Sequence, residues 1–557
     1  MKSLAPTPSS GSRSATSRTL YVASALVVIA VAGIAVRAVL MPQLGHVADT
    51  FDFFEWASSL AKRPVAAVYL DPEQANGVQV NYPPAYLYVL SLLPGLHDTC
   101  VGGVPWSDPG IVQGLRREAM RLLYRDFAER VRDAGTARRT LGAKAYSDTV
   151  ADMESAGLGE EFRDARVRTY ADLVEFFEQH LLGGSHLGAG HRSVLVFLKL
   201  PAVLADLALA GLLFAAGWRW AGRWPAVLAA GGVFLSPVVV HDSAYWGQVD
   251  SIPTALVVAC LMALVARVWW LVFLLLVVAL LTKLQAIIIA PIVVAVVVAT
   301  LASRWAGSAG EVRKEATRLA AALAVAGLGA AVLLFPIVRG SALKQLLGIY
   351  TGLGSQYPYL TVRAFNLWWF FTTGDPIITF EASPRDDVAT FIGVTPKAIG
   401  FVLLLAVVGF VIAAILKRRG DRPTVVLGAL LIAMAFFCLQ TEIHERYGYP
   451  IVPLAIMAAL VLKRRYWWVA AGASLTHFAN LLFAGLAERP GGPPAGGITL
   501  ALATTPALTY AVAAVNLALL AIAASDLYRL AFVSPLTGNQ PAETAPPGGT
   551  AGPRRRR

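Results

Sequence analysis

Long apolar stretches recur along most of the chain and are separated by short polar connections. A helix crosses the apolar core of a bilayer with about 20 residues, and the stretches in this sequence are of that length or somewhat shorter. We therefore predict an all-α polytopic membrane protein with about 12 transmembrane helices. The expected spans are 20–41, 194–217, 224–241, 250–266, 268–282, 285–302, 318–337, 397–416, 423–440, 448–462, 466–486 and 504–526.

Composition supports this class and excludes an ordinary soluble protein. Hydrophobic residues make up 56% of the chain and charged residues only 15%, whereas soluble domains are about 25% charged. The net charge of +12 is explained by cytoplasmic loops rich in Lys and Arg, so we expect membrane lipids as partners and no nucleic acid. The three cysteines (Cys100, Cys260 and Cys438) are too far apart in the sequence to indicate a disulfide framework or a metal site.

The distribution of basic residues predicts the orientation. With the tail 1–19 inside, every inside connection carries at least one cation and the outside connections carry few, as the positive-inside rule requires. We therefore expect a multi-pass protein of the plasma membrane with both termini in the cytoplasm. No A-x-A-like cleavage site follows the run 20–41, so it is expected to remain as the first span. The inside cations are Arg219, Arg223, Arg267, Arg304, Arg313, Lys314, Arg318, Lys417, Arg418, Arg419, Arg422, Lys463, Arg464, Arg465, Arg529 and 554–557.

The apolar segment 82–96 is too short for a straightforward span, and two prolines lie at its start. If it crossed the membrane, the later basic loops would fall outside. We therefore predict a helix on the outer interface, which makes 42–193 one large extracytoplasmic loop. Apolar residues three and four apart over 111–133 and 167–182 predict amphipathic helices in a soluble insert at 97–192.

The rest of the chain divides by the same patterns. We expect a core transmembrane module at 194–337, a second extracytoplasmic loop at 338–396, a C-terminal transmembrane module at 397–527 and a disordered cytoplasmic tail at 528–557.

Four polar clusters interrupt the apolar pattern, and the predicted topology places all of them at the outer face. Ionisable groups at membrane depth are costly and usually mark function. Each cluster alone has an ordinary explanation, such as a helix cap, a snorkelling lysine or a solvated loop. Together on one face they favour a single outward-facing site. The clusters are Asp49 and Asp52; Trp246, Gln248 and Asp250; Lys283 and Gln285; and His444, Glu445 and Arg446.

A carboxylate beside several cations suits group transfer from a phosphate-linked lipid. The carboxylate can accept the proton of an attacking hydroxyl, while Arg and His neutralise the charge that develops on the departing phosphate. Arginine in particular can bind two phosphate oxygens at once.

The order of these motifs over about 20–480 resembles that of the GT-C glycosyltransferases, in particular the dolichyl-phosphate-glucose glucosyltransferases and bacterial mannosyltransferase-like membrane proteins. The matching elements are Asp49, Trp56-Ala57, Tyr82-Pro83-Pro84-x-Tyr86, Lys199-Leu200-Pro201 with Asp206, Trp246-Gly247-Gln248-Val249-Asp250-Ser251, Lys283-x-Gln285, Tyr357-Pro358, Asn366-Leu367-Trp368 and His444-Glu445-Arg446-Tyr447. The insert 97–192 is larger than its counterpart in these relatives.

The resemblance implies transfer of a monosaccharide from a polyprenyl-phosphate donor to a glycan or lipid acceptor at the outer face, with inversion. It implies Asp49 as the general base, with Asp52 as the rival, and His444 and Arg446 at the donor phosphate. We expect Glu445 and Lys283 to assist there, and no cofactor besides the lipid-linked donor. The sequence has no Asp-x-Asp in the first loop or at 246–250, so no required metal is expected. The expected substrate-binding residues are Tyr82, Trp246, Gln248, Asp250, Gln285 and Asn366.

Two other classes remain open from the sequence. A secondary transporter or a flippase of lipid-linked glycans would carry ionisable groups near mid-membrane, and Asp206 is the one residue that fits this pattern. An inactive relative that scaffolds a partner through the insert 97–192 is the third option. The clustering of charges at one face favours the enzyme.

Overall fold

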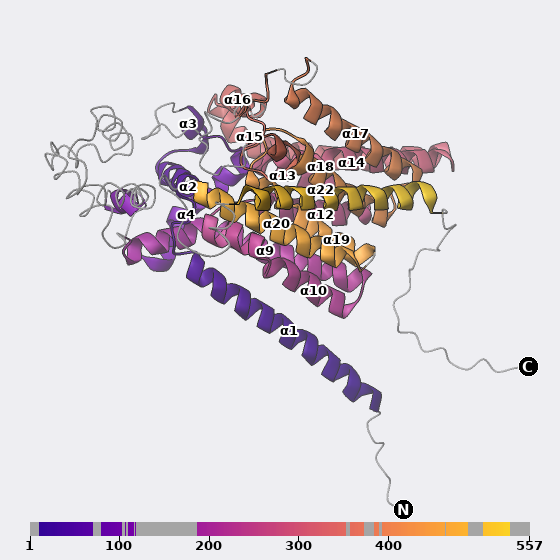
Figure 1. Ribbon diagram of the computed structural model, residues 1–557, viewed down its shortest axis with the longest axis horizontal. Helices are drawn as coiled ribbons and strands as arrows, with labels where there is room; N and C mark the ends of the chain where they lie inside the picture. The colour runs from indigo at the N-terminus through magenta and orange to yellow at the C-terminus, as the bar shows by residue number, and fades with distance from the viewer. Residues whose placement is uncertain are drawn as a thin grey trace, which may run out of the picture.

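The computed structural model describes most of the chain as helices that run side by side in one bundle (Figure 1). The described residues are 10–70, 80–102, 106, 108, 110–115, 117–118, 187–352, 357–372, 384–388, 393–462, 464–487 and 505–534.

Each of the 12 predicted spans contains a helix of the structure. The helices are α1 (Ser10–Leu40), α2 (Val47–Leu60), α3 (Val65–Leu70), α4 (Pro84–Val101), α9 (Ala189–Trp220), α10 (Arg223–Phe234), α11 (Pro237–Val240), η1 (His241–Trp246), α12 (Ser251–Val265), α13 (Trp269–Thr282), η2 (Leu284–Ile289), α14 (Ala290–Trp305), α15 (Ala309–Arg339), α16 (Leu343–Gly352), η3 (Leu367–Phe371), α17 (Pro396–Lys417), α18 (Arg422–Leu439), η5 (Glu445–Gly448), α19 (Ile451–Val461), α20 (Tyr466–Ala487), α22 (Pro506–Tyr528) and η6 (Arg529–Val533).

Among the described residues, seven helices are long and apolar enough to cross a membrane. The number rises to eight if α10 and the following segment Pro237–Trp246, bent by 42° relative to it, form one span. The chain is therefore an all-α, multi-span membrane protein, as the sequence predicts. The predicted number of spans is higher because α12, α13, α19 and α20 are not among these candidates, and the first three have only 15, 14 and 11 residues. At 1.5 Å per residue each of these three is shorter than the apolar core of about 30 Å.

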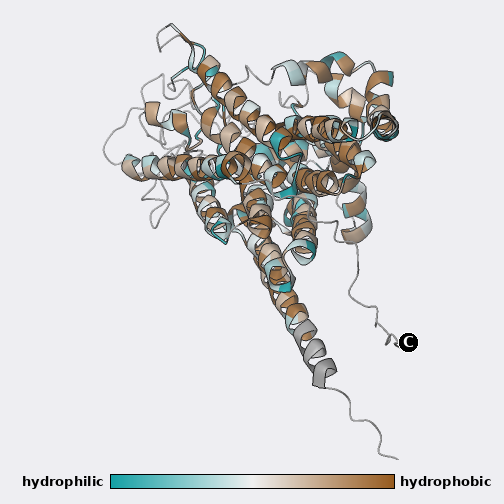
Figure 2. Ribbon diagram, turned by 90° about the vertical axis from the view of Figure 1, so that its right-hand side faces the viewer, coloured by the Kyte–Doolittle hydropathy of each residue, from teal (hydrophilic) through white to brown (hydrophobic). Residues whose placement is uncertain are grey.

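Burial separates the centre of the bundle from its periphery. In the most apolar window of α18, 78% of the residues are buried, against 17% in α1 and 17% in α15. The exposed residues of α1 are themselves apolar, for example Val27, Val28 and Val31, and Figure 2 shows hydrophobic residues along much of the length of the bundle helices. Apolar residues all around a helix are typical of a helix that faces lipid, so α1 and α15 lie at the outside.

The helices α2, α3 and α4 lie at one end of the bundle (Figure 1). The segment 82–96 falls mainly in α4, whose first residue is Pro84, and α4 is not among the seven candidate spans. Aromatic residues of α2 and α4, including Phe53, Trp56 and Tyr86, form a buried cluster with α9. The predicted insert helices 111–133 and 167–182 lie outside the described residues, apart from a helical stretch at 111–115 and 117–118.

Candidate active site

Asp49 lies in the first turn of α2 and faces two other elements of the predicted site. His46 caps the helix, because its Nδ1 accepts the backbone N–H of Asp49 at 3.3 Å. The indole Nε1 of Trp246 donates to Asp49 Oδ2 at 2.7 Å, and Nη1 of Arg446 lies 3.5 Å from the same oxygen. The carboxylate of Asp49 therefore brings together Trp246 and Arg446, two other predicted site residues that lie about 200 and 400 positions further along the chain.

The loop that carries Trp246 is held in place by backbone contacts. Trp246 is the last residue of the π-helix η1, and Gly247 after it adopts the left-handed conformation at φ +90°. Thr50 donates to the Trp246 carbonyl at 2.9 Å. The buried Lys199 ammonium donates to the carbonyls of Gln43 and Tyr245, each at 2.7 Å, and so ties the end of η1 to the turn before α2.

A second ion pair of the site, between Lys283 and Asp250, lies at the end of α13. Lys283 follows the last residue of α13, and its ammonium contacts Asp250 Oδ1 at 2.6 Å. The same ammonium lies 5.5 Å from the centre of the Tyr82 ring. Tyr82 in turn donates from its hydroxyl to Gln248 Oε1 at 3.1 Å. The second and third clusters therefore form one network with the start of α4.

His444, Glu445 and Arg446 follow α18 in a short turn. The Val362 N–H donates to the Ile443 carbonyl at 2.9 Å, and the Tyr357 ring packs edge-on against His444 at 4.8 Å. Arg446 Nη1 donates to Glu445 Oε1 at 3.1 Å. Arg446 is thus held by Glu445 on one side and Asp49 on the other, while its buried Nε has no hydrogen-bond partner among the described residues.

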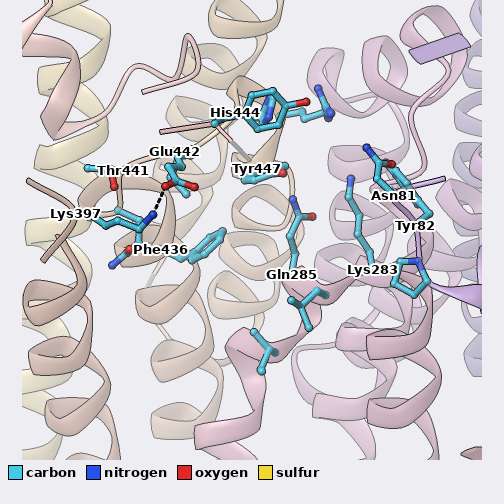
Figure 3. Close-up of a pocket in the computed structure, with 17 residues that line it drawn as sticks. Asn81, Tyr82, Lys283, Gln285, Lys397, Phe436, Thr441, Glu442, His444 and Tyr447 are labelled. Atoms are coloured by element: carbon cyan, nitrogen blue, oxygen red, sulfur yellow. Dashed lines mark hydrogen bonds and ion pairs between the residues drawn. The ribbon is translucent and has the colours of Figure 1, made fainter. Parts of the chain in front are cut away.

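A pocket of about 310 Å³ opens beside this network (Figure 3). Its volume is at the lower end of the range for small-molecule sites, about 300–1,000 Å³. Five of the predicted residues line the pocket: Tyr82, Lys283, Gln285, His444 and Arg446. Asp49, Gln248, Asp250 and Glu445 do not line it but contact residues that do. Trp246 lies one contact further away, because it donates to Asp49.

Asn366 is the predicted binding residue that the structure places elsewhere. Its side chain is fully buried, and it donates to the carbonyls of Phe437 and Gln440 at 3.2 and 3.1 Å. Its Oδ1 accepts the N–H of Trp368. Asn366 therefore joins η3 to the end of α18 and supports the segment that leads to His444.

The two carboxyl groups of α2 have opposite electrostatic surroundings. Burial alone would raise the pKa of Asp49, but the charge of Arg446 and the hydrogen bond from Trp246 lower it well below its usual value. Asp52 lies one turn further along α2, where burial and the negative charge of Asp49 raise its pKa to about 7. For Glu445, burial is outweighed by His444 and Arg446, and the pKa falls to about 2. At neutral pH Asp49 and Glu445 are therefore carboxylates.

Three further residues belong to this region and were not predicted. Lys397 and Glu442 line the pocket and form an ion pair. Asp242 in η1 is fully buried, and neither of its carboxylate oxygens has a hydrogen-bond partner among the described residues. The available signal for Asp242 was its position only a few residues before Trp246, Gln248 and Asp250, in the same polar segment. Lys397 and Glu442 look like ordinary residues at a helix start and in a loop, so only the tertiary structure reveals them.

The chain matches no known family model, and no curated protein matches its sequence. Within the described part of the chain, no group of three His, Cys, Asp or Glu side chains is placed to hold a metal ion. The site is thus defined by its own geometry: a carboxylate and several cations beside a pocket with both polar and apolar lining residues in a multi-span membrane protein.

Proposed function

We propose that this protein is a membrane glycosyltransferase of the GT-C type. It moves a monosaccharide from a polyprenyl-phosphate donor to a hydroxyl of a glycan or lipid acceptor, with inversion at the anomeric carbon. The observation that carries the proposal is the 3.5 Å contact between Asp49 and Arg446. It puts a carboxylate able to accept a proton next to a cation that lines a pocket and can bind phosphate.

The pocket has the composition that a lipid phosphate needs. Lys283, His444 and Arg446 supply polar and cationic groups, whereas Leu284, Ile287 and Phe436 supply an apolar part of the lining. Ile287 is 50% exposed, so the apolar part of the lining is open to the surroundings of the protein. The phosphate would bind to the cations while the polyprenyl chain leaves past the apolar side chains.

The reaction then follows from the position of Asp49. Trp246 and Arg446 both contact Oδ2, and Oδ1 accepts the hydroxyl proton of the acceptor. The acceptor oxygen forms its bond to the anomeric carbon as the bond from that carbon to the phosphate oxygen breaks. Polyprenyl phosphate leaves with the electron pair, and Arg446 and Lys283 stabilise its charge. A single displacement of this kind inverts the anomeric centre.

The proposal includes the topology expected from the basic loops. About 12 spans, both termini in the cytoplasm and the site at the extracytoplasmic face of the plasma membrane are parts of it. The first loop, 42–193, would then bring Asp49 to the side where the lipid-linked donor and the acceptor meet.

The transporter or flippase alternative receives less support, because Asp206 is already fully engaged. Its Oδ2 accepts from Arg37 Nη2 at 2.7 Å and from Ser243 at 2.6 Å, and its Oδ1 accepts from Tyr449 at 3.1 Å. This network joins α1, α9, η1 and the start of α19. Asp206 is therefore better explained as a structural residue than as an ion-binding group at mid-membrane.

The test is turnover by the purified full-length protein with polyprenyl-phosphate-mannose, -glucose or -arabinose and a membrane extract as the source of acceptor. Consumption of one donor supports the proposal, and consumption of none contradicts it.

Arg446→Ala should lower kcat/KM by about ten- to a hundredfold, since a charge-assisted hydrogen bond contributes about 1.5–3 kcal/mol. Arg446→Lys should recover only part, because a single ammonium replaces the planar guanidinium.

Arg385→Ala is the matched control. It removes an arginine from an exposed ion pair with Asp387 that does not line the pocket, so activity should stay at the wild-type level. Full activity of Arg446→Ala would exclude Arg446 from the donor site.

A further inference from the structure

The wall of the pocket opposite Lys283 and Tyr82 carries a second charged pair. Figure 3 shows Lys397 and Glu442 on one side of the pocket, Lys283 and Tyr82 on the other, and Gln285 between them. Lys397 lies in the first turn of α17 and Glu442 in the turn after α18, and the two form an ion pair. The side chain of Lys397 is 40% exposed and forms part of the pocket lining.

The backbone holds Glu442 in an uncommon conformation. Its φ is +60°, a region that favours glycine and costs about 1–2 kcal/mol for a residue with a side chain. The Glu442 N–H donates to the Tyr359 carbonyl at 3.1 Å. Its neighbour Thr441 donates to the buried carboxylate of Asp386 at 2.6 Å. Asp386 also accepts the Lys397 N–H on its backbone carbonyl, so one loop positions both members of the pair.

The side of the pocket formed by Lys397 and Glu442 differs in its chemistry from the side formed by Lys283 and Arg446, where we place the phosphate. A carboxylate in the lining repels phosphate, so an anion should bind near Lys283 and Arg446 and away from Glu442. Sugar hydroxyls both donate and accept hydrogen bonds. Lys397 can donate to them and Glu442 can accept from them. Gln285 adds an amide whose buried Nε2 has no hydrogen-bond partner among the described residues.

We propose that Glu442, Lys397 and Gln285 form the subsite that binds the sugar hydroxyls of the donor and thereby selects the sugar that is transferred. This inference rests on the proposed function. It assigns the two walls of one pocket to the two polar parts of one donor: phosphate on the side of Lys283 and Arg446, sugar on the side of Glu442 and Lys397.

The experiment compares two probes on the full-length protein in lipid nanodiscs. One is bare polyprenyl phosphate, and the other is the polyprenyl-phosphate sugar that the wild type consumes. Glu442→Gln and Lys397→Met should each weaken binding of the sugar-bearing donor about ten- to a hundredfold, while binding of bare polyprenyl phosphate stays unchanged. Glu442→Gly suits the positive φ. It should likewise weaken binding of the sugar-bearing donor but not of bare polyprenyl phosphate, and it should keep the thermal stability of the wild type.

Asp387→Asn is the control for loss of a carboxylate. It changes the exposed partner of Arg385 on the same loop and should leave both affinities unchanged. Equal losses for the two probes would overturn the subsite, because the pair would then serve the phosphate or the fold. Unchanged affinity for both probes in Glu442→Gln and Lys397→Met would also overturn it. If the wild type binds and consumes no polyprenyl-phosphate sugar, the proposed function fails, and the subsite fails with it.

Discussion

Asp49 and Asp52 lie one helical turn apart, and their different pKa values allow the base to be identified. Asp49 is adjacent to Arg446 and Trp246, which hold its pKa low, so it is ionised over the whole physiological range. Asp52 has a pKa raised to about 7 by burial and by the charge of Asp49. A pKa near 7 suits a general base, but geometry favours Asp49, because Asp49 contacts the arginine that lines the pocket.

We predict that, when kcat/KM is measured as a function of pH, it declines only well below pH 7; we call this decline the acid limb. A base must be deprotonated to act, so a base with a low pKa keeps the rate until the pH falls to that pKa. With Asp52 as the base, the rate would instead decline as the pH falls through about 7. Asp49→Asn should reduce turnover by about 10²–10⁴-fold with donor binding retained, and Asp52→Asn should remain active with the same acid limb.

The pair of variants assayed side by side decides between the two carboxylates. An acid limb near pH 7 that disappears in Asp52→Asn would make Asp52 the base. Normal turnover by both variants would show that α2 does not supply the base.

At the scale of elements, the turn between α1 and α2 depends on one glycine. Gly45 has φ +72°, and a Cβ there would lie 1.8 Å from the Tyr245 carbonyl oxygen. We predict that Gly45→Ala separates α2 from η1 and lowers both the melting temperature and turnover, measured by thermal unfolding and donor consumption in detergent. The expected destabilisation exceeds the roughly 1–2 kcal/mol of a left-handed alanine alone, because the clash is with backbone.

Gly102→Ala separates these two contributions. Gly102 has φ +76°, and a Cβ there meets no atom within 4 Å, so this variant carries only the backbone cost. It should be destabilised less than Gly45→Ala and keep full turnover per folded molecule. Equal effects of the two substitutions would mean that the close approach of the turn to η1 is unimportant.

The sequence predicts the helices well. It predicts which distant residues lie together only for those that belong to a recognisable motif. Apolar runs fix helices because every backbone group in lipid must find a partner within its own segment, and all 12 predicted spans contain a helix. Tyr82, Lys283 and Arg446 were predicted as site residues and share one pocket. Glu442 was not, because its position depends on a positive φ and on contacts with residues at 359 and 386, which no local pattern encodes.

On the scale of the whole molecule, the site forms where several helix ends meet. α13 and α18 end beside it, and α2 and α17 begin beside it. Helix ends leave backbone groups without intrahelical partners, so polar side chains concentrate there at little extra cost in a lipid environment. Basic residues lie at the opposite ends of α17 and α18, for example Lys417 and Arg422, and the positive-inside rule predicts that these ends face the cytoplasm.

The orientation can be measured with the native Cys100. This residue lies in α4 and is exposed, whereas Cys260 and Cys438 are buried, so both can be replaced by alanine to leave a single reactive thiol. We predict that a membrane-impermeant maleimide labels Cys100 on intact cells, because the proposed topology places α4 in the first extracytoplasmic loop. Arg313→Cys in a background without other cysteines is the matched control. Position 313 is exposed near the start of α15 and lies in a predicted cytoplasmic loop. This thiol should therefore react only after lysis. The reverse pattern would contradict the predicted orientation. A crossing of the membrane by 82–96 alone would not explain it, because that crossing would turn every later loop over and place Asp49 and the pocket on opposite sides of the bilayer. Since the structure joins Asp49 to Arg446 at 3.5 Å, labelling of Cys100 only after lysis would therefore require inversion of the whole bundle and would move the proposed reaction to the cytoplasmic face.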